Sequence, residues 1–95
     1  MAKLEHTAKY PDIRRSLRSL FPDSKGGDNR RHIHGKIAMG KTGVFMVTSE
    51  NQGFTSDRMY VVRKITNEDG RVSAKPLASF SWGHVATQKM MELAG

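Results

Sequence analysis

The spacing of the apolar residues changes near Arg30, and this change constrains the fold more than any other feature of the chain. Before it, apolar residues recur at intervals of three and four, as on one face of a helix: Ile13, Leu17, Leu20 and Phe21. After it, they recur at even intervals, as on one face of a strand: Ile33, Ile37 and Met39. The sequence therefore predicts a helix followed by β-structure.

The predicted helix starts around Tyr10 and ends before Pro22. Pro11 suits the first helical turn, and the carboxylate of Asp12 suits the positive end of the helix dipole. Residues 1–9 show no periodicity and are expected to form a flexible arm, and residues 23–29 form a turn-rich loop.

Four strands are expected after the loop. They cover residues 30–39, 44–48, 58–66 and 71–77, separated by a turn at 40–43, a polar loop at 50–57 and a four-residue connection at 67–70. Pro76 marks the fourth strand as an edge strand or as the end of that strand, because proline cannot donate a backbone hydrogen bond.

A second helix is expected at the C-terminus, with Ser79 or Ser81 as its N-cap. Trp82, Ala86, Met90 and Leu93 recur at helical spacing, and we expect the Trp82 and Phe45 rings in the core. The predicted fold class is α+β: an N-terminal helix, a four-stranded antiparallel sheet and a C-terminal helix in one domain over residues 10–95. If both helices packed on one face, the other face of the sheet would stay open.

Positive charge is concentrated in one part of the chain. Sixteen lysines and arginines face nine carboxylates, a net charge of +7. Between Arg14 and Lys41 there are eight cations and only Asp23 and Asp28, a net charge of +6. Like charges repel one another, so such clustering indicates an anionic partner.

We therefore expect a small basic protein that binds DNA or RNA through the phosphate backbone, with little sequence specificity. No helix-turn-helix, zinc finger or RRM aromatic signature is present. The candidate contacts are the basic residues of the first helix, the loop and the first strand, with one loop aromatic for base stacking: Arg14, Arg15, Arg18, Lys25, Arg30, Arg31, His32, His34, Lys36, Lys41 and Phe54.

Two other functions remain open at this point. The chain could be an inhibitor or modulator, of the kind phages encode, that docks on an acidic surface of a host protein, since arginine is a favoured interface residue. It could also be a small ribonuclease in which His32 and His34, two apart on a strand, act as acid and base. We expect binding rather than catalysis.

No metal or cofactor is expected. His32 and His34 could chelate a metal with His6 or His84, but the chain has no cysteine and no third ligand at a typical spacing. The stretch from Gly35 to Thr42 matches the Walker A pattern, yet cationic residues precede it and strand-forming residues follow it. We interpret it as strand and turn.

The remaining expectations concern location and assembly. No apolar run is long enough to span a membrane, and the N-terminus has no secretory signal pattern. The absence of cysteine fits a reducing compartment. We expect a cytoplasmic protein with no membrane contact, and a homodimer through an edge strand remains open.

Overall fold

The computed structural model of the protein describes residues 3–5, 10–20, 31–51 and 58–95. Its elements follow in the order β1 (Lys3–Glu5), α1 (Pro11–Leu20), β2 (Arg31–Gly40), β3 (Gly43–Asn51), β4 (Arg58–Glu68), β5 (Arg71–Phe80) and α2 (Gly83–Ala94). Neither helix within these ranges has the length and the apolar composition to cross a membrane.

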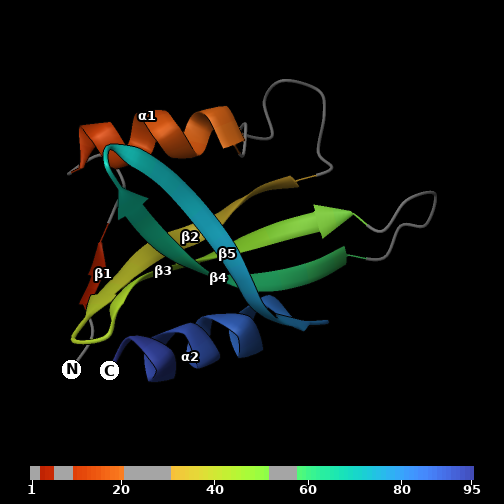
Figure 1. Ribbon diagram of the computed structural model, residues 1–95. Coiled ribbons are helices and arrows are strands. Elements are labelled where there is room, and N and C mark those ends of the chain that lie inside the picture. The colour runs from red at the N-terminus through yellow and green to blue at the C-terminus, as the bar shows by residue number, and fades with distance from the viewer. Residues whose placement is uncertain (1–2, 6–9, 21–30, 52–57) are drawn as a thin grey trace.

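The strands form one antiparallel meander in the order β1-β2-β3-β4-β5 (Figure 1). The prediction of a four-stranded sheet between two helices is wrong, because Lys3–Glu5, from the expected flexible arm, forms a fifth strand. Leu4 of β1 pairs with Ala38 of β2. Three residues with one apolar side chain carry no periodic signal, so this strand is visible only in the tertiary pairing.

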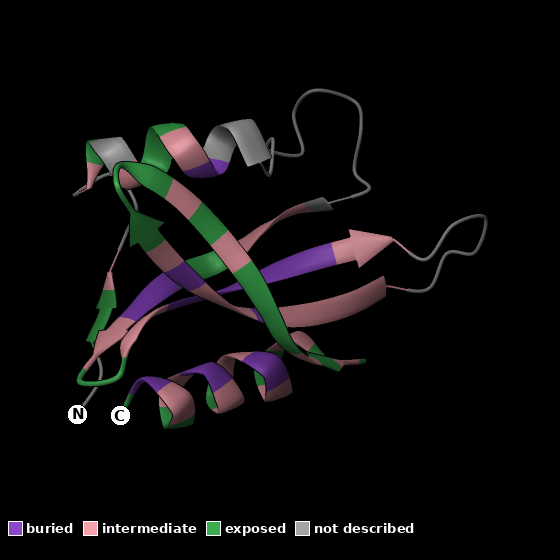
Figure 2. Cartoon of the chain, in the orientation of Figure 1, coloured by how far each residue is buried: buried purple, intermediate pink, exposed green. Residues whose placement is uncertain are grey.

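The two helices cover opposite faces of the sheet (Figure 1). On the face we call the α1 face, Leu17 packs with Ile37, Met46 and Ile65. On the other, the α2 face, three residues of α2 pack against three strands: Ala86, Met90 and Ala94 against Ala38, Phe45, Val47 and Val62. Figure 2 shows the buried side of α2 turned toward the sheet. Burial on both faces explains why β3 is apolar on both.

Phe45 is buried in this core, as predicted, with 3% of its surface exposed. The two-sided core also decides a point that the sequence left open, namely which face of the sheet each helix covers. Covering both faces removes more apolar surface from water than covering one, at about 25 cal/mol per Å².

A two-residue turn closes the β4–β5 hairpin. Asp69 and Gly70 have φ angles of 53° and 80°, and Glu68 pairs with Arg71 across the turn. Positive φ at both central residues is the type I′ geometry, which Asp-Gly favours because it matches the twist of the strands. The four-residue connection expected at 67–70 is therefore too long, since Asn67 pairs with Val72 within the ladder.

The segment from Gly35 to Thr42 is strand and turn, as predicted. β2 continues to Gly40, Lys41 and Thr42 form the turn, and β3 begins at Gly43, where a P-loop would need a helix. Gly35, with a φ of 76°, lies in an irregularity of the β2–β3 ladder between His34 and Ala38. At this irregularity β2 has two more residues than β3. Because side chains alternate with a period of two, His34 before it and Ala38 after it lie on the same face of the sheet.

The β2–β3 turn holds the C-terminal end of α2. The backbone N–H of Thr42 donates to the Ala94 carbonyl at 3.3 Å, and the Thr42 hydroxyl donates to the Leu93 carbonyl. These bonds satisfy helix carbonyls that have no partner within the helix. A Cβ atom on Gly40 would lie 1.9 Å from the Ala94 oxygen, so this contact requires glycine.

The junction between β5 and α2 lies further along the chain than the sequence predicted. β5 extends past Leu77 to Phe80, and Pro76 lies in this edge strand, as predicted. The predicted serine caps are wrong, because Trp82 is the N-cap of α2 and its side chain makes no capping hydrogen bond. The backbone of Trp82 is extended, with φ −125° and ψ 131°.

A hydrogen-bonded ion pair lies within the α1 face. Arg63 Nη2 and Glu50 Oε2 are 2.9 Å apart, and the side chains are 11% and 15% exposed. Thr48 Oγ1 accepts a bond from Arg63 Nε at 3.1 Å and donates to Glu50 Oε2 at 2.7 Å. Arg63 Nη1 donates to the Ala74 carbonyl at 3.0 Å. The guanidinium thus joins β3, β4 and β5.

Candidate nucleic-acid interface

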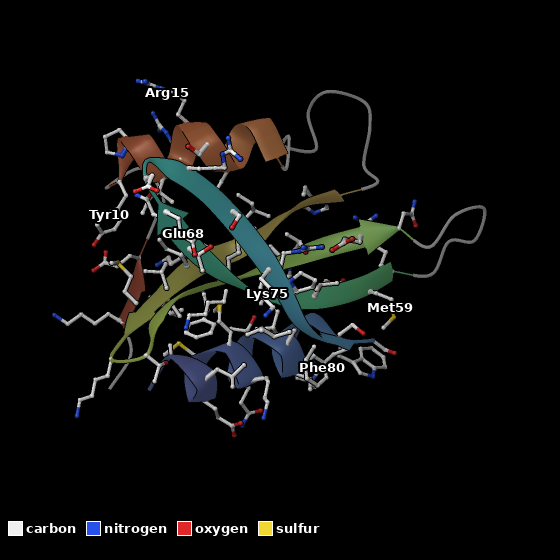
Figure 3. The ribbon with its side chains drawn as sticks, viewed as in Figure 1. Tyr10, Arg15, Met59, Glu68, Lys75 and Phe80 are labelled. Atoms are coloured by element: carbon white, nitrogen blue, oxygen red, sulfur yellow. The ribbon has the colours of Figure 1, made fainter. Side chains whose placement is uncertain are left out.

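Arg14 and Arg15 lie on the outer side of α1. Leu17 of the same helix is buried against the sheet, whereas both arginines are exposed, and Figure 3 shows Arg15 pointing away from the sheet. The backbone of Arg18 belongs to α1, but its side chain is outside the described residues. These arginines form a cationic surface only on the α1 side of the molecule.

His32 and His34 lie on the opposite side. They pair with Ser49 and Val47, and Val47 belongs to the α2 core, so both imidazoles are on the α2 face. The sequence named them together with the helix arginines as candidate contacts and left open whether the two groups converge. The structure separates the two groups by the thickness of the sheet.

The other candidate contacts are scattered or not described. Lys36 is exposed at the irregularity of β2, and Lys41 is exposed in the β2–β3 turn. Arg31 is in β2, but its side chain is outside the described residues, as are all of Lys25, Arg30 and Phe54.

Arg58, at the start of β4, anchors a polar group at one end of the α2 face. Its Nε donates to Ser49 Oγ at 2.7 Å, and its Nη2 lies 3.4 Å from the Ser49 carbonyl oxygen and 3.2 Å from His32 Nδ1. A guanidinium can only donate, so Nδ1 of His32 accepts and Nε2 carries the ring proton. His32 therefore presents an N–H donor next to a fixed positive charge.

Burial, followed by the charges of Arg58 and His34, lowers the pKa of His32 below its ordinary value of 6.5. The ring is therefore neutral near pH 7. The two-imidazole cleavage hypothesis needs a base nitrogen that can take a proton from a ribose hydroxyl. In His32 one nitrogen accepts from Arg58 and the other already carries a proton, so His32 itself has no free nitrogen to act as this base.

His34 and Tyr60 support the first turn of α2. Their rings meet edge to face, with centroids 5.0 Å apart. A Cβ on Gly83 would lie 2.7 Å from His34 Nε2 and 3.2 Å from Tyr60 Cε1. Glycine at this position lets the start of the helix lie directly on both rings.

Trp82 is 67% exposed, so the prediction that it belongs to the core is wrong. The spacing argument assumed that Trp82 is inside the helix. It is the extended N-cap, and its indole does not follow the buried stripe of Ala86 and Met90. The indole lies beside the exposed imidazole of His84, with ring centroids 6.2 Å apart and planes tilted by 45°.

These contacts join seven residues into one cluster, in which Ser49 is buried and the other six are at least partly exposed. We call it the Trp82 patch: His32, His34, Ser49, Arg58, Tyr60, Trp82 and His84. Phe80, which pairs with Tyr60 in the ladder, is labelled beside the start of α2 in Figure 3. None of the carboxylates that the structure describes belongs to the patch. Glu50 follows Ser49 in β3 but bonds Arg63 on the α1 face.

Sequence reasoning found His32 and His34 but missed Arg58, Ser49, Trp82 and His84 as members of one site. The only local sign of the site in the sequence was the Trp-Gly-His stretch. Its glycine has a low helix propensity and therefore marks an unusual start for a helix. Arg58 comes from a distant strand, and register alone brings it to His32.

Neither of two other possible ligand sites in the described residues fits an anion or a metal ion. An open depression at the β4–β5 hairpin is lined by residues of both charge signs, Glu68, Asp69, Arg71 and Ser73, so it has no preference for an anion. Over the described ranges, no group of three or more His, Asp or Glu side chains is arranged to hold a metal ion. His6 lies outside those ranges.

Comparison with protein-family models, with curated proteins and with solved structures finds no match to the chain.

Proposed function

We propose that the protein binds nucleic acid, DNA or RNA, with little sequence specificity, and that the Trp82 patch is a contact surface. The observation that carries this proposal is the composition of the patch. The exposed Trp82 indole lies beside the His84 imidazole, and in the same patch the Arg58 guanidinium donates to His32. Arginine attracts phosphate, and aromatic rings stack on bases.

The net charge of +7 supports the same partner. Several described carboxylates are paired or lie far from the patch. Glu50 pairs with Arg63, and Glu92 pairs with Lys89 at 3.7 Å, whereas Glu68 and Asp69 lie at the β4–β5 turn. A positive field raises association rates with polyanions at low salt.

Arg14 and Arg15 offer a second contact surface, because they are exposed on α1. The sheet lies between them and the patch, so a single straight segment of nucleic acid does not contact both. We propose that they contribute phosphate contacts independently of the patch.

The test is fluorescence anisotropy with labelled 20-nucleotide DNA and RNA at about 50 mM and 200 mM salt, since phosphate-driven affinity falls steeply over this interval. The diagnostic variant is His84→Glu, which puts a carboxylate into the patch at an exposed position. It does not weaken α2, because a negative charge is favourable in the first helical turn.

The matched control is Asn67→Glu, which adds the same charge at an exposed site nine residues along β4 from Arg58, about 30 Å away. We expect His84→Glu to reduce affinity several-fold and Asn67→Glu to have little effect, since salt screens charge over about 10 Å. Absence of binding to every oligonucleotide at about 50 mM salt rejects the proposal. A protein partner that resists nuclease in a pull-down, with no oligonucleotide binding, supports the inhibitor hypothesis instead.

A further inference from the structure

We infer that the Trp82 patch selects single-stranded over duplex nucleic acid and stacks a base on the Trp82 indole. This inference rests on the proposed function and adds the class of ligand. Three features of the patch carry it: an exposed ring, a rigid support beneath it, and a cationic group at the same end of the α2 face.

The exposed ring is the first feature. Trp82 is 67% exposed, whereas tryptophan in folded proteins is usually largely buried. The extended N-cap backbone turns the indole away from the core that α2 forms with the sheet. Every base has a π-face that can stack on such a ring, but in a duplex these faces are already stacked on neighbouring bases. An accessible indole therefore favours unpaired bases.

The second feature is that the support of the indole is rigid. The Trp82 carbonyl accepts the backbone N–H of Ala86 at 3.1 Å, so the residue is held by the first turn of α2. Gly83 lies against His34 and Tyr60, whose rings pack edge to face. A preorganised ring loses little conformational freedom when a base stacks on it, and this raises affinity.

The third feature is the placement of the cationic group along the strands. Arg58 pairs with Asn51 in the outermost pair of the β3–β4 ladder, and His32 pairs with Ser49, two residues inward along β3. His34 pairs with Val47, two residues further inward, and lies against Gly83 at the start of α2. Gly83, the neighbour of Trp82, lies against His34 and Tyr60, so the imidazoles, the Arg58 guanidinium and the indole are at the same end of the α2 face. A strand that stacks a base on the indole has these N–H groups nearby as donors for its phosphates.

The combination favours nucleic acid over a protein partner. A protein that docks on an exposed tryptophan needs an apolar pocket, whereas the neighbours of Trp82 in the patch are imidazoles, a phenol and a guanidinium. Imidazole and guanidinium N–H groups are donors for phosphate oxygens.

The experiment uses the full chain and the fluorescence of Trp82, which is its single tryptophan. Three ligands of equal length are titrated at about 50 mM salt, where phosphate contacts are strongest: (dT)20, a 20-mer of abasic sites with the same backbone charge, and a 20-base-pair duplex. We expect saturable quenching with (dT)20, no quenching with the abasic strand, and weaker binding of the abasic strand and the duplex.

Anisotropy of labelled (dT)20 tests the residue itself. We expect Trp82→Ala to weaken binding about five- to hundredfold, the factor that the loss of one base stack produces, and Trp82→Phe to recover part of it. Leu4→Ala is the control, because Leu4 is also an exposed apolar residue, 44% exposed, on β1 at the other edge of the sheet. Circular dichroism of each variant checks that it is folded.

The outcomes separate the two proposals. Equal binding of (dT)20, the abasic strand and the duplex, without quenching, overturns the inference and leaves nucleic-acid binding intact. Unchanged affinity of Trp82→Ala for (dT)20 also overturns it. No binding of any of the three ligands removes both proposals. A nuclease-resistant protein partner that is lost on Trp82→Ala, in the absence of oligonucleotide binding, assigns the patch to a protein.

Discussion

Arg63→Met removes the guanidinium that joins three strands on the α1 face, while it keeps an unbranched side chain of similar reach. The substitution deletes the bonds to Thr48, to the Ala74 carbonyl and to Glu50. Removing one partner of a buried ion pair costs about 3–5 kcal/mol, because the other charge is left in a poorly solvated place. An exposed pair contributes only about 0–1 kcal/mol.

The exposed fractions of the two side chains decide which of these two free-energy ranges applies. The side chains of Arg63 and Glu50 are 11% and 15% exposed, so the pair is close to the buried case. We expect Arg63→Met to lower the free energy of unfolding by about 3 kcal/mol, at the lower end of the buried range because some solvent reaches both groups.

The assay is urea unfolding followed by far-ultraviolet circular dichroism. Tryptophan fluorescence is a poor probe here, because Trp82 is already 67% exposed in the folded state. The matched variants are Glu50→Gln and the double variant Arg63→Met/Glu50→Gln, which complete a double-mutant cycle. We expect the double variant to be more stable than Arg63→Met alone, since it contains no unpaired carboxylate.

Two results would refute this reasoning. A decrease in the free energy of unfolding below about 1 kcal/mol for Arg63→Met would mean that the pair behaves as an exposed surface pair and not as a buried one. Additive losses in the double variant show that the two side chains are not coupled, whatever the distance between them.

Three further substitutions test the packing and the titration of the α2 face. Gly40→Ala puts a Cβ 1.9 Å from the Ala94 oxygen and is expected to cost at least about 2 kcal/mol in urea unfolding; wild-type stability would contradict the contact. Met90→Ala empties a site that is 1% exposed and is expected to cost about 2–5 kcal/mol by the same measurement; a loss under 1 kcal/mol would contradict its place in the core. The pKa of His32 is lowered in the folded protein, so the unfolded chain takes up the proton first and stability falls as the pH drops below about 6.5. We expect His32→Gln to lose less stability than wild type between pH 7 and pH 5, and equal slopes would contradict the lowered pKa.

The sequence was informative wherever the signal is local. The switch in period near Arg30 identified the four long strands, and the residues around Gly35 to Thr42 showed that a Walker A match was a strand and a turn. Side-chain alternation and turn residues depend on neighbours a few positions away, so they can be seen in a single chain. For the same reason the apolar stripe of Ala86 and Met90 correctly indicated a buried helix face.

The candidate site depended on contacts that no local pattern contains. Arg58 meets His32 across β3, and Gly83 meets His34 between α2 and β2. The candidate contacts named from the sequence came from a helix and a strand because their basic residues are close in sequence. In the structure the helix arginines lie on the α1 side of the sheet and the strand histidines lie on the α2 face.

The sequence by itself determined the charge of the protein, its helix and strand segments other than β1, and which residues alternate on each strand. Only the tertiary structure decided that β1 joins the sheet, that α1 and α2 cover opposite faces, and that Trp82 stands outside the core. The physical reason is that periodicity shows which side chains share a face, whereas the choice of what covers that face depends on packing between distant segments.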